Sequence, residues 1–199
     1  MIITKFYVEF GGDKVKAKHN IEIVDIFRSK ANEFGTEIYE LDIKKINPQQ
    51  SHRLKCLSPL CEHYGICKVC PPNIPSVSEF REALHSYSRA FLVVYKEEVV
   101  DIEIYQNEFS AEKKVAETIS ALEWASIELG YYHVLGLGVG GCKYCSSCTP
   151  PGVRCRNPFK ARPSPSGYGI NATQLAIEAG IPIEWPPNKY VSFLGLVLL

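Results

Sequence analysis

Neither sign of charge predominates in this chain of 199 residues, because 22 Lys and Arg side chains are matched by 22 Asp and Glu side chains. Proteins that bind nucleic acid through its phosphates usually carry a basic excess on the binding domain. The balance of charge therefore argues against a non-specific nucleic-acid binder. We expect no nucleic-acid partner for this protein.

Long apolar runs are also missing. The most apolar stretch, residues 193–199, is far shorter than the roughly 20 residues that a membrane helix needs. The first residues lack a basic segment followed by an apolar stretch and a small-residue cleavage site, which together mark a signal peptide. We therefore expect an intracellular, cytoplasmic protein with no membrane partner.

Familiar catalytic constellations are absent as well. The sequence has no Ser-His-Asp order, no His-Glu-x2-His motif and no phosphate-binding loop. The glycines between positions 136 and 141 superficially resemble a dinucleotide fingerprint, but that fingerprint opens a helix and this loop leads into cysteines. We assign no catalytic residues, and we expect an electron-transfer or accessory protein in preference to an enzyme.

Cysteine, in contrast, is present in two compact sets of four, and none lies outside them. The first cysteine set consists of Cys56, Cys61, Cys67 and Cys70. The second cysteine set consists of Cys142, Cys145, Cys148 and Cys155. Disulfides are rare inside cells, where closely spaced cysteines indicate metal binding or redox chemistry. A chain long enough to build a sizeable core also has little need of disulfides. We expect all eight cysteines to be metal ligands.

The second set has the more specific spacing. Two successive Cys-x2-Cys intervals resemble the start of the ferredoxin run that binds a [4Fe-4S] cluster. Structural zinc sites more often pair two Cys-x2-4-Cys units across a longer gap, and the first set fits that description loosely. We therefore expect an iron-sulfur cluster at the second set, with zinc as the alternative, and either metal at the first set.

Residues that flank the cysteines are candidates for contact with a cofactor. Gly140 and Gly141 allow the backbone to pass close to a bulky centre. Arg154 and Arg156 flank Cys155 and would offset the negative charge of a thiolate cluster, dock an acidic partner, or simply form a solvated loop. His63 lies between two cysteines, where a hydrogen-bonding role is expected more often than a ligand role.

The remaining pattern predicts an α/β fold with a mixed sheet flanked by helices and with two irregular cysteine-rich loops, at about 52–75 and 140–168. We expect one domain over residues 1–199. Helical periodicity or capping residues predict helices, and apolar runs predict strands. The predicted helices cover residues 20–34, 76–87, 110–129 and 171–179, with Ser110 as the cap of the third. The predicted strands cover residues 2–10, 36–43, 90–95, 131–139, 181–185 and 190–199.

Both cysteine motifs together resemble the family labelled "predicted metal-binding protein", a domain of unknown function from anaerobic bacteria and archaea. The likeness lies in the segment from Cys61 to Cys70-Pro71-Pro72 and in Gly141-Cys142 through Cys155 to Ser164, and it covers roughly residues 35–199. The resemblance implies metal binding, as iron-sulfur, through both sets, and it implies no reaction. The additional Cys56 is either a ligand or a spare thiol.

Three functions are consistent with these observations. The first is an iron-sulfur protein, with two [4Fe-4S] clusters, that transfers electrons to a larger anaerobic metalloenzyme system or delivers a cluster to it. The second is an enzyme with a cluster open to substrate, and the third is a zinc-stabilised interaction module. We favour the first, with a protein partner, because each set is complete at four cysteines.

Overall fold

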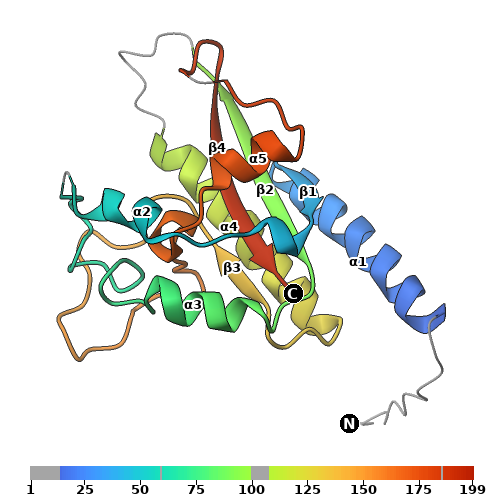
Figure 1. Ribbon diagram of the computed structural model, residues 1–199, viewed down its shortest axis with the longest axis horizontal. Helices are drawn as coiled ribbons and strands as arrows, with labels where there is room; N and C mark the ends of the chain where they lie inside the picture. Colours follow the sequence, from blue (N-terminus) through green and yellow to red (C-terminus); the bar gives the residue numbers. More distant parts are fainter. Residues whose placement is uncertain (1–13, 59, 100–107, 185) are drawn as a thin grey trace.

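The computed structural model describes residues 14–58, 60–99, 108–184 and 186–199. Figure 1 shows one sheet with helices packed on it and two long irregular segments gathered at one side. In chain order, the elements are α1 (Lys14–Glu33), β1 (Glu37–Leu41), η1 (Ile43–Lys45), α2 (Gln50–Arg53), η2 (Leu54–Cys56), α3 (Val77–Leu84), β2 (Ala90–Glu98), α4 (Glu108–Glu128), β3 (Leu135–Leu137), η4 (Pro165–Tyr168), α5 (Ala172–Glu178) and β4 (Tyr190–Leu198).

The four strands form a sheet in the order β1-β2-β4-β3. The predicted combination of a sheet with flanking helices and cysteine-rich loops is confirmed. All three described pairings are antiparallel, whereas the sequence analysis expected a mixed sheet. The reason is the position of β4. The strands β2 and β3, joined through α4, run in the same direction, but β4 lies between them and pairs antiparallel with both.

Each face of the sheet packs against its own group of helices. Because successive side chains of a strand point to opposite faces, Phe91 and Val93 of β2 face α1 and α4, while Leu92 and Val94 face the opposite side. All four side chains are buried. On that opposite side they meet residues of α3, η4 and α5, including Phe80, Tyr168 and Leu175. The first cysteine-rich segment contributes Ile74 to this second layer, whereas the second segment contacts α4 through Lys143 and Arg162.

Local signals in the sequence account for several element ends. The Ser76 hydroxyl accepts from the Glu79 N–H at 3.2 Å, and the Glu79 carboxylate accepts from the Ser76 N–H at 2.7 Å, so that α3 begins with a capping box. Asn171 caps α5 by accepting from the Gln174 N–H. Gly130 follows α4 with φ +90°, a conformation that glycine adopts without strain.

Some predicted boundaries were wrong. The helix α4 begins at Glu108, so Ser110 lies within it and is not its cap. The strand expected at 131–139 is confined to β3, because the Tyr131 N–H still closes the end of α4 on the Ser126 carbonyl. No strand is described at 181–184, where the Ile181 N–H instead closes α5 on Ala176. The strand expected at 2–10 and position 185 lie outside the described residues.

Candidate metal centre

The first cysteine region begins at η2 and runs as an irregular loop to the cap of α3. Its ends are fixed by side chains that reach backbone carbonyls: Arg53 donates to Pro75 at 2.5 Å, and Arg81 donates to Pro48 at 2.6 Å. Within the loop, the backbone N–H of Cys61 bonds the Cys56 carbonyl, and the N–H of Cys70 bonds the Cys67 carbonyl. These turns bring the four cysteines of the first set close together in a short segment.

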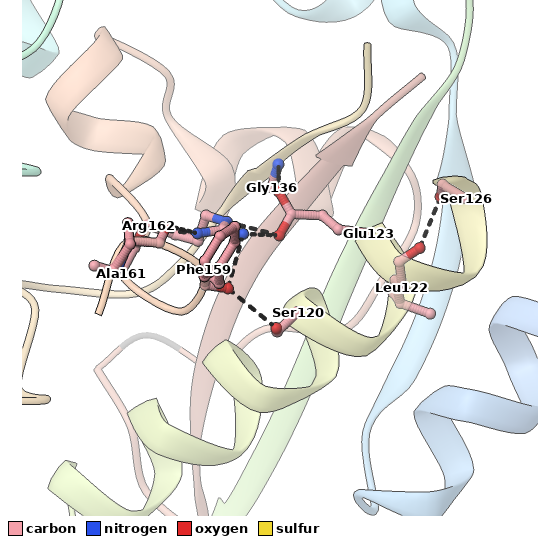
Figure 2. A network of polar contacts seen from close by, with 9 residues as sticks. Ser120, Leu122, Glu123, Ser126, Gly136, Phe159, Ala161 and Arg162 are labelled. Carbon is pink, nitrogen blue, oxygen red and sulfur yellow. Dashed lines mark hydrogen bonds and ion pairs between the residues drawn. The ribbon is translucent and has the colours of Figure 1, made fainter. Parts of the chain in front are cut away.

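The second cysteine region leaves β3 at Gly138 and returns to the sheet edge at Pro163, where the Gly138 N–H donates to the Pro163 carbonyl at 2.8 Å. Figure 2 shows the polar network that holds its returning end. Arg162 bonds a carboxylate oxygen of Glu123 on α4 at 2.6 Å and also donates to the carbonyls of Pro158, Phe159 and Ala161. One guanidinium therefore attaches the loop to the longest helix.

Glu123 is buried, and its environment acts on its ionisation in two directions. Burial raises the pKa of the Glu123 carboxyl, while Arg162 and the Gly136 N–H, which donates at 2.8 Å, partly oppose the rise. The two oxygens of Glu123 serve different partners, since Oε1 accepts from Gly136 and Oε2 from Arg162. The carboxylate thus connects β3, α4 and the second cysteine region at one point.

The two cysteine regions lie side by side, as Figure 1 also shows at the left of the molecule. The Lys68 ammonium of the first region donates to the Pro150 carbonyl of the second at 2.8 Å. The His63 ring lies directly over Gly141, where an added Cβ would come within 1.9 Å of its Cδ2 atom. Gly141 is therefore required for the close approach of the two loops rather than for an unusual backbone angle.

Thiols from both sets meet at Cys67. The pKa of Cys67 is lowered because the thiol of Cys142, and next that of Cys70, hydrogen-bond to its sulfur, and the N–H groups of Val69 and Cys142 add to this effect. The pKa values of Cys70 and Cys142 are raised by the same bonds to Cys67 and by burial. Cys67 is therefore the cysteine of this group whose ionisation is most favoured, and it connects the two sets.

Cys56 and Cys61, the remaining cysteines of the first set, interact electrostatically with Cys70. Charges on Cys61 and Cys56 contribute to the raised pKa of Cys70. Burial, and next the charge of Cys61, raise the pKa of Cys56. These mutual effects place Cys56, Cys61 and Cys70 within electrostatic reach of each other.

Two cavities divide the cysteines unequally. A large cavity of about 410 Å³ is lined by Cys56, Cys61 and Cys70, and a small cavity of about 130 Å³ is lined by Cys67 together with all four cysteines of the second set. His63 lines both cavities. The sequence grouped the cysteines as four and four, whereas the cavities group them as three and five. Sequence spacing held no signal for this division, because it depends on a contact between distant loops.

Several N–H groups point at sulfur atoms of the second set. Asn157 donates from its backbone N–H to the Cys155 sulfur at 3.3 Å and from its side-chain amide to the Cys145 sulfur at 3.2 Å. The Tyr144 N–H bonds the Cys142 sulfur. Donors of this kind stabilise thiolates, the form of cysteine that binds metal, and they tune the potential of a bound cluster.

The donor chemistry of this region fits a thiolate-bound metal centre. All eight cysteines are free thiols, two of them buried and six half-buried. Over the described residues, no three Cys, His, Asp or Glu side chains yet surround one point as the ligands of a single ion.

The four residues expected to contact a cofactor differ in the cavity that they line. Gly140 and Gly141 line the large cavity, and Gly140 has φ +61° with the Glu112 carboxylate directly over it. Arg156 lines the small cavity and donates to the Ser147 carbonyl at 2.8 Å. Arg154 is exposed and lines none of the three cavities described in this region.

Four contacts at the site were not predicted from the sequence. The backbone bond from Asn157 to Cys155 spans two residues, so a Cys-x-Asn pattern could have indicated it. The bond from Asn157 to Cys145 and the attachment of Arg162 to Glu123 have no sequence signal, because they join separate segments. The contact of His63 with Gly141 likewise exists only in the folded chain.

Comparison with known families gives a match. A family model described as "Predicted metal-binding protein (DUF2284)" matches residues 39–199. The chain belongs to this family. The DUF2284 match includes both cysteine regions, the last three residues of β1 and all of β2, β3 and β4, which confirms the resemblance drawn from the motifs. Neither the curated proteins nor the solved structures contain a match to the chain.

Metal binding is the property that the family description supports, and it specifies neither the metal nor a reaction. Among the described residues of this DUF2284 protein, no helix has both the length and the apolar character needed to cross a membrane.

Proposed function

We propose that this protein is an iron-sulfur protein that holds two [4Fe-4S] clusters and transfers electrons to a larger anaerobic metalloenzyme system or delivers a cluster to it. The observation that carries the proposal is the gathering of eight free thiols around two adjacent cavities, with contact between the sets through Cys67 and Cys142. Two centres bound there would lie close enough to exchange electrons.

The ligand environment favours iron-sulfur over zinc. The Cys-x2-Cys-x2-Cys spacing of the second set is the ferredoxin pattern. The N–H donors to Cys142, Cys145 and Cys155 are also suited to an anionic cluster, whose potential depends on hydrogen bonds to sulfur. Zinc in one or both sets is the alternative, and it would give a protein without redox chemistry.

The surface around the second set suits a protein partner. Ile66 is 66% exposed and Phe159 is 70% exposed, and they belong to the two cysteine regions. Arg154, Arg156 and Lys160 are exposed nearby in the sequence. Exposed apolar and basic side chains in these loops suit an acidic partner, because complementary charge guides association. We place this partnership in the cytoplasm, where thiols remain reduced.

The experiment that tests the proposal is anaerobic purification followed by analysis of iron, acid-labile sulfide and zinc. We expect a brown protein with about eight iron and eight sulfide atoms per chain, which is two [4Fe-4S] clusters, and bleaching of its visible spectrum by dithionite. A colourless protein with about two zinc ions and no sulfide would overturn the proposal and leave a zinc-stabilised interaction module.

A further inference from the structure

We infer that the first centre is held by only Cys56, Cys61 and Cys70, and that its remaining coordination position binds a small anionic ligand in the large cavity. This inference rests on the proposed function, because it concerns one of the two proposed clusters. It departs from the arrangement that the sequence suggested, in which each set supplies four ligands to its own centre.

The position of Cys67 carries the first half of the inference. Cys67 is buried and lines the small cavity with the second set, while the other three cysteines of the first set line the large cavity. Its sulfur is engaged by the Cys142 thiol and by the Cys142 N–H, both from the second region. The second set already offers four thiolates. Three thiolates therefore remain for the first centre.

The size of the large cavity supports a ligand beside the three cysteines. Its volume of about 410 Å³ falls within the range of small-molecule sites, roughly 300–1,000 Å³, whereas the small cavity, at about 130 Å³, is well below that range. Its lining extends beyond the cysteines to the polar side chains Ser164, Asn171, Thr173 and Ser192.

The charge of the lining indicates which ligand the cavity suits. Apart from the cysteines and Tyr64, the ionisable side chains that line it are Lys55, His52 and His63, and no Asp or Glu is among its lining residues. Hydroxyl and amide groups of the lining add hydrogen-bond donors. A carboxylate or another small anion with an oxygen, nitrogen or carbon donor would pair with these groups while it occupied an open position on iron.

A pair of matched variants tests the ligand count. Cys70→Ser should lose about four of eight iron atoms, the content of one [4Fe-4S] cluster, whereas Cys67→Ser should keep all eight. Loss of about four iron atoms from Cys67→Ser, with the second centre retained, would overturn the inference and restore the arrangement of four and four. Both variants are measured in the anaerobically purified full chain.

A second measurement does not depend on the folding of either variant. The wild-type protein, reduced with dithionite, is titrated with ¹³C-labelled cyanide, and electron-nuclear double resonance detects any carbon bound to the cluster. We expect a ¹³C coupling that persists in Cys145→Ser, which lacks the second centre. No coupling in a wild-type protein with eight iron atoms would overturn the inference, because a fully cysteine-bound cluster offers no position for cyanide.

Charge reversal tests whether the cavity selects anions. Lys55→Glu should raise the apparent Kd for cyanide about fivefold, the effect of losing one exposed charge contact. The matched control is Lys160→Glu, since Lys160 lines a neighbouring cavity of about 210 Å³ instead. Equal Kd values for the two variants would overturn the anion preference. A protein without iron would instead refute the proposed function, which separates the two failures.

Discussion

At the scale of single residues, Asn157 has an unusual number of sulfur contacts. Its backbone N–H and its side-chain amide donate to two different cysteines of the second set, Cys155 and Cys145. Hydrogen bonds to cysteine sulfur stabilise the more negative, reduced state of a cluster and therefore raise its potential. The side chain of Asn157 should thus contribute to the potential of the second centre.

Replacement of Asn157 by Ala should make the reduction potential of the second centre more negative by about 40 mV, the equivalent of one hydrogen bond in a one-electron couple. A redox titration followed by electron paramagnetic resonance measures the shift. The control is Asn73→Ala, because the Asn73 amide donates to the Cys67 carbonyl and not to a sulfur. An equal potential in Asn157→Ala and wild type would contradict a role for this amide.

Gly141 and His63 form the tightest packing between the two cysteine regions. A Cβ at position 141 would collide with the His63 ring, so Gly141→Ala should destabilise the protein by about 1–3 kcal/mol. Urea unfolding under anaerobic conditions measures the change. Gly138→Ala is the control, because its Cβ would meet Arg162 at an ordinary 3.6 Å.

The double variant His63→Ala with Gly141→Ala decides whether that collision is the cause. It should recover most of the stability lost in Gly141→Ala, since removal of the ring makes room for the methyl group. Additive effects of the two substitutions on the free energy of unfolding would show that collision with the His63 ring does not cause the loss of stability in Gly141→Ala.

At the scale of elements, α4 anchors the second cysteine region through Glu123 and Arg162. Both side chains are largely buried, with 9% and 17% of their surfaces exposed. The raised pKa of Glu123 means that its carboxyl favours the protonated form more in the folded than in the unfolded chain. The stabilisation that comes from this preferential protonation of Glu123 is therefore fully present below the ordinary carboxyl pKa. It is lost as the pH rises through the raised pKa of the folded state.

Two substitutions of Glu123 should differ strongly. Glu123→Ala leaves the Gly136 N–H without an acceptor and leaves the Arg162 guanidinium with carbonyl acceptors but no carboxylate, so it should cost about 3 kcal/mol of unfolding free energy. Glu123→Gln removes the charge but keeps one oxygen acceptor, so it should cost less than Glu123→Ala, about 1 kcal/mol. Urea unfolding near neutral pH measures both.

The control for this pair is Glu117→Ala, which removes an exposed ion pair with Lys113 at 3.7 Å and should change stability by no more than about 0.5 kcal/mol. Equal losses for Glu123→Ala and Glu117→Ala would show that the buried pair does not anchor the loop.

Most elements followed from local patterns, and the exceptions have tertiary causes. The apolar run from Ala90 predicted β2, and Ser76 predicted the start of α3, because both signals are contained in a few neighbouring residues. The short β3 could not be foreseen, since Tyr131 is held by the end of α4. The placement of β4 between β2 and β3 is a property of the whole chain and has no local signal.

At the scale of the whole molecule, the sheet and its helices support the two cysteine regions, the first beside the face that carries α3 and α5 and the second attached to α4. The sequence identified all eight cysteines and the two loops that carry them, because cysteine spacing is a local property. The sequence could not predict which cysteines share a cavity, because Cys67 joins the second set only after the chain folds. The resulting contact between the sets is the central feature of the proposed site.

Electron paramagnetic resonance of the fully reduced, anaerobically purified protein tests this account most directly, with Cys145→Ser as the comparison. Two adjacent clusters should give a spectrum broadened by spin–spin coupling in the wild type, and removal of the second centre should leave one simple, uncoupled signal with about four iron atoms. A wild-type spectrum that is the plain sum of two independent signals, or a protein with no signal and bound zinc, would contradict the claim that two neighbouring iron-sulfur centres occupy these loops.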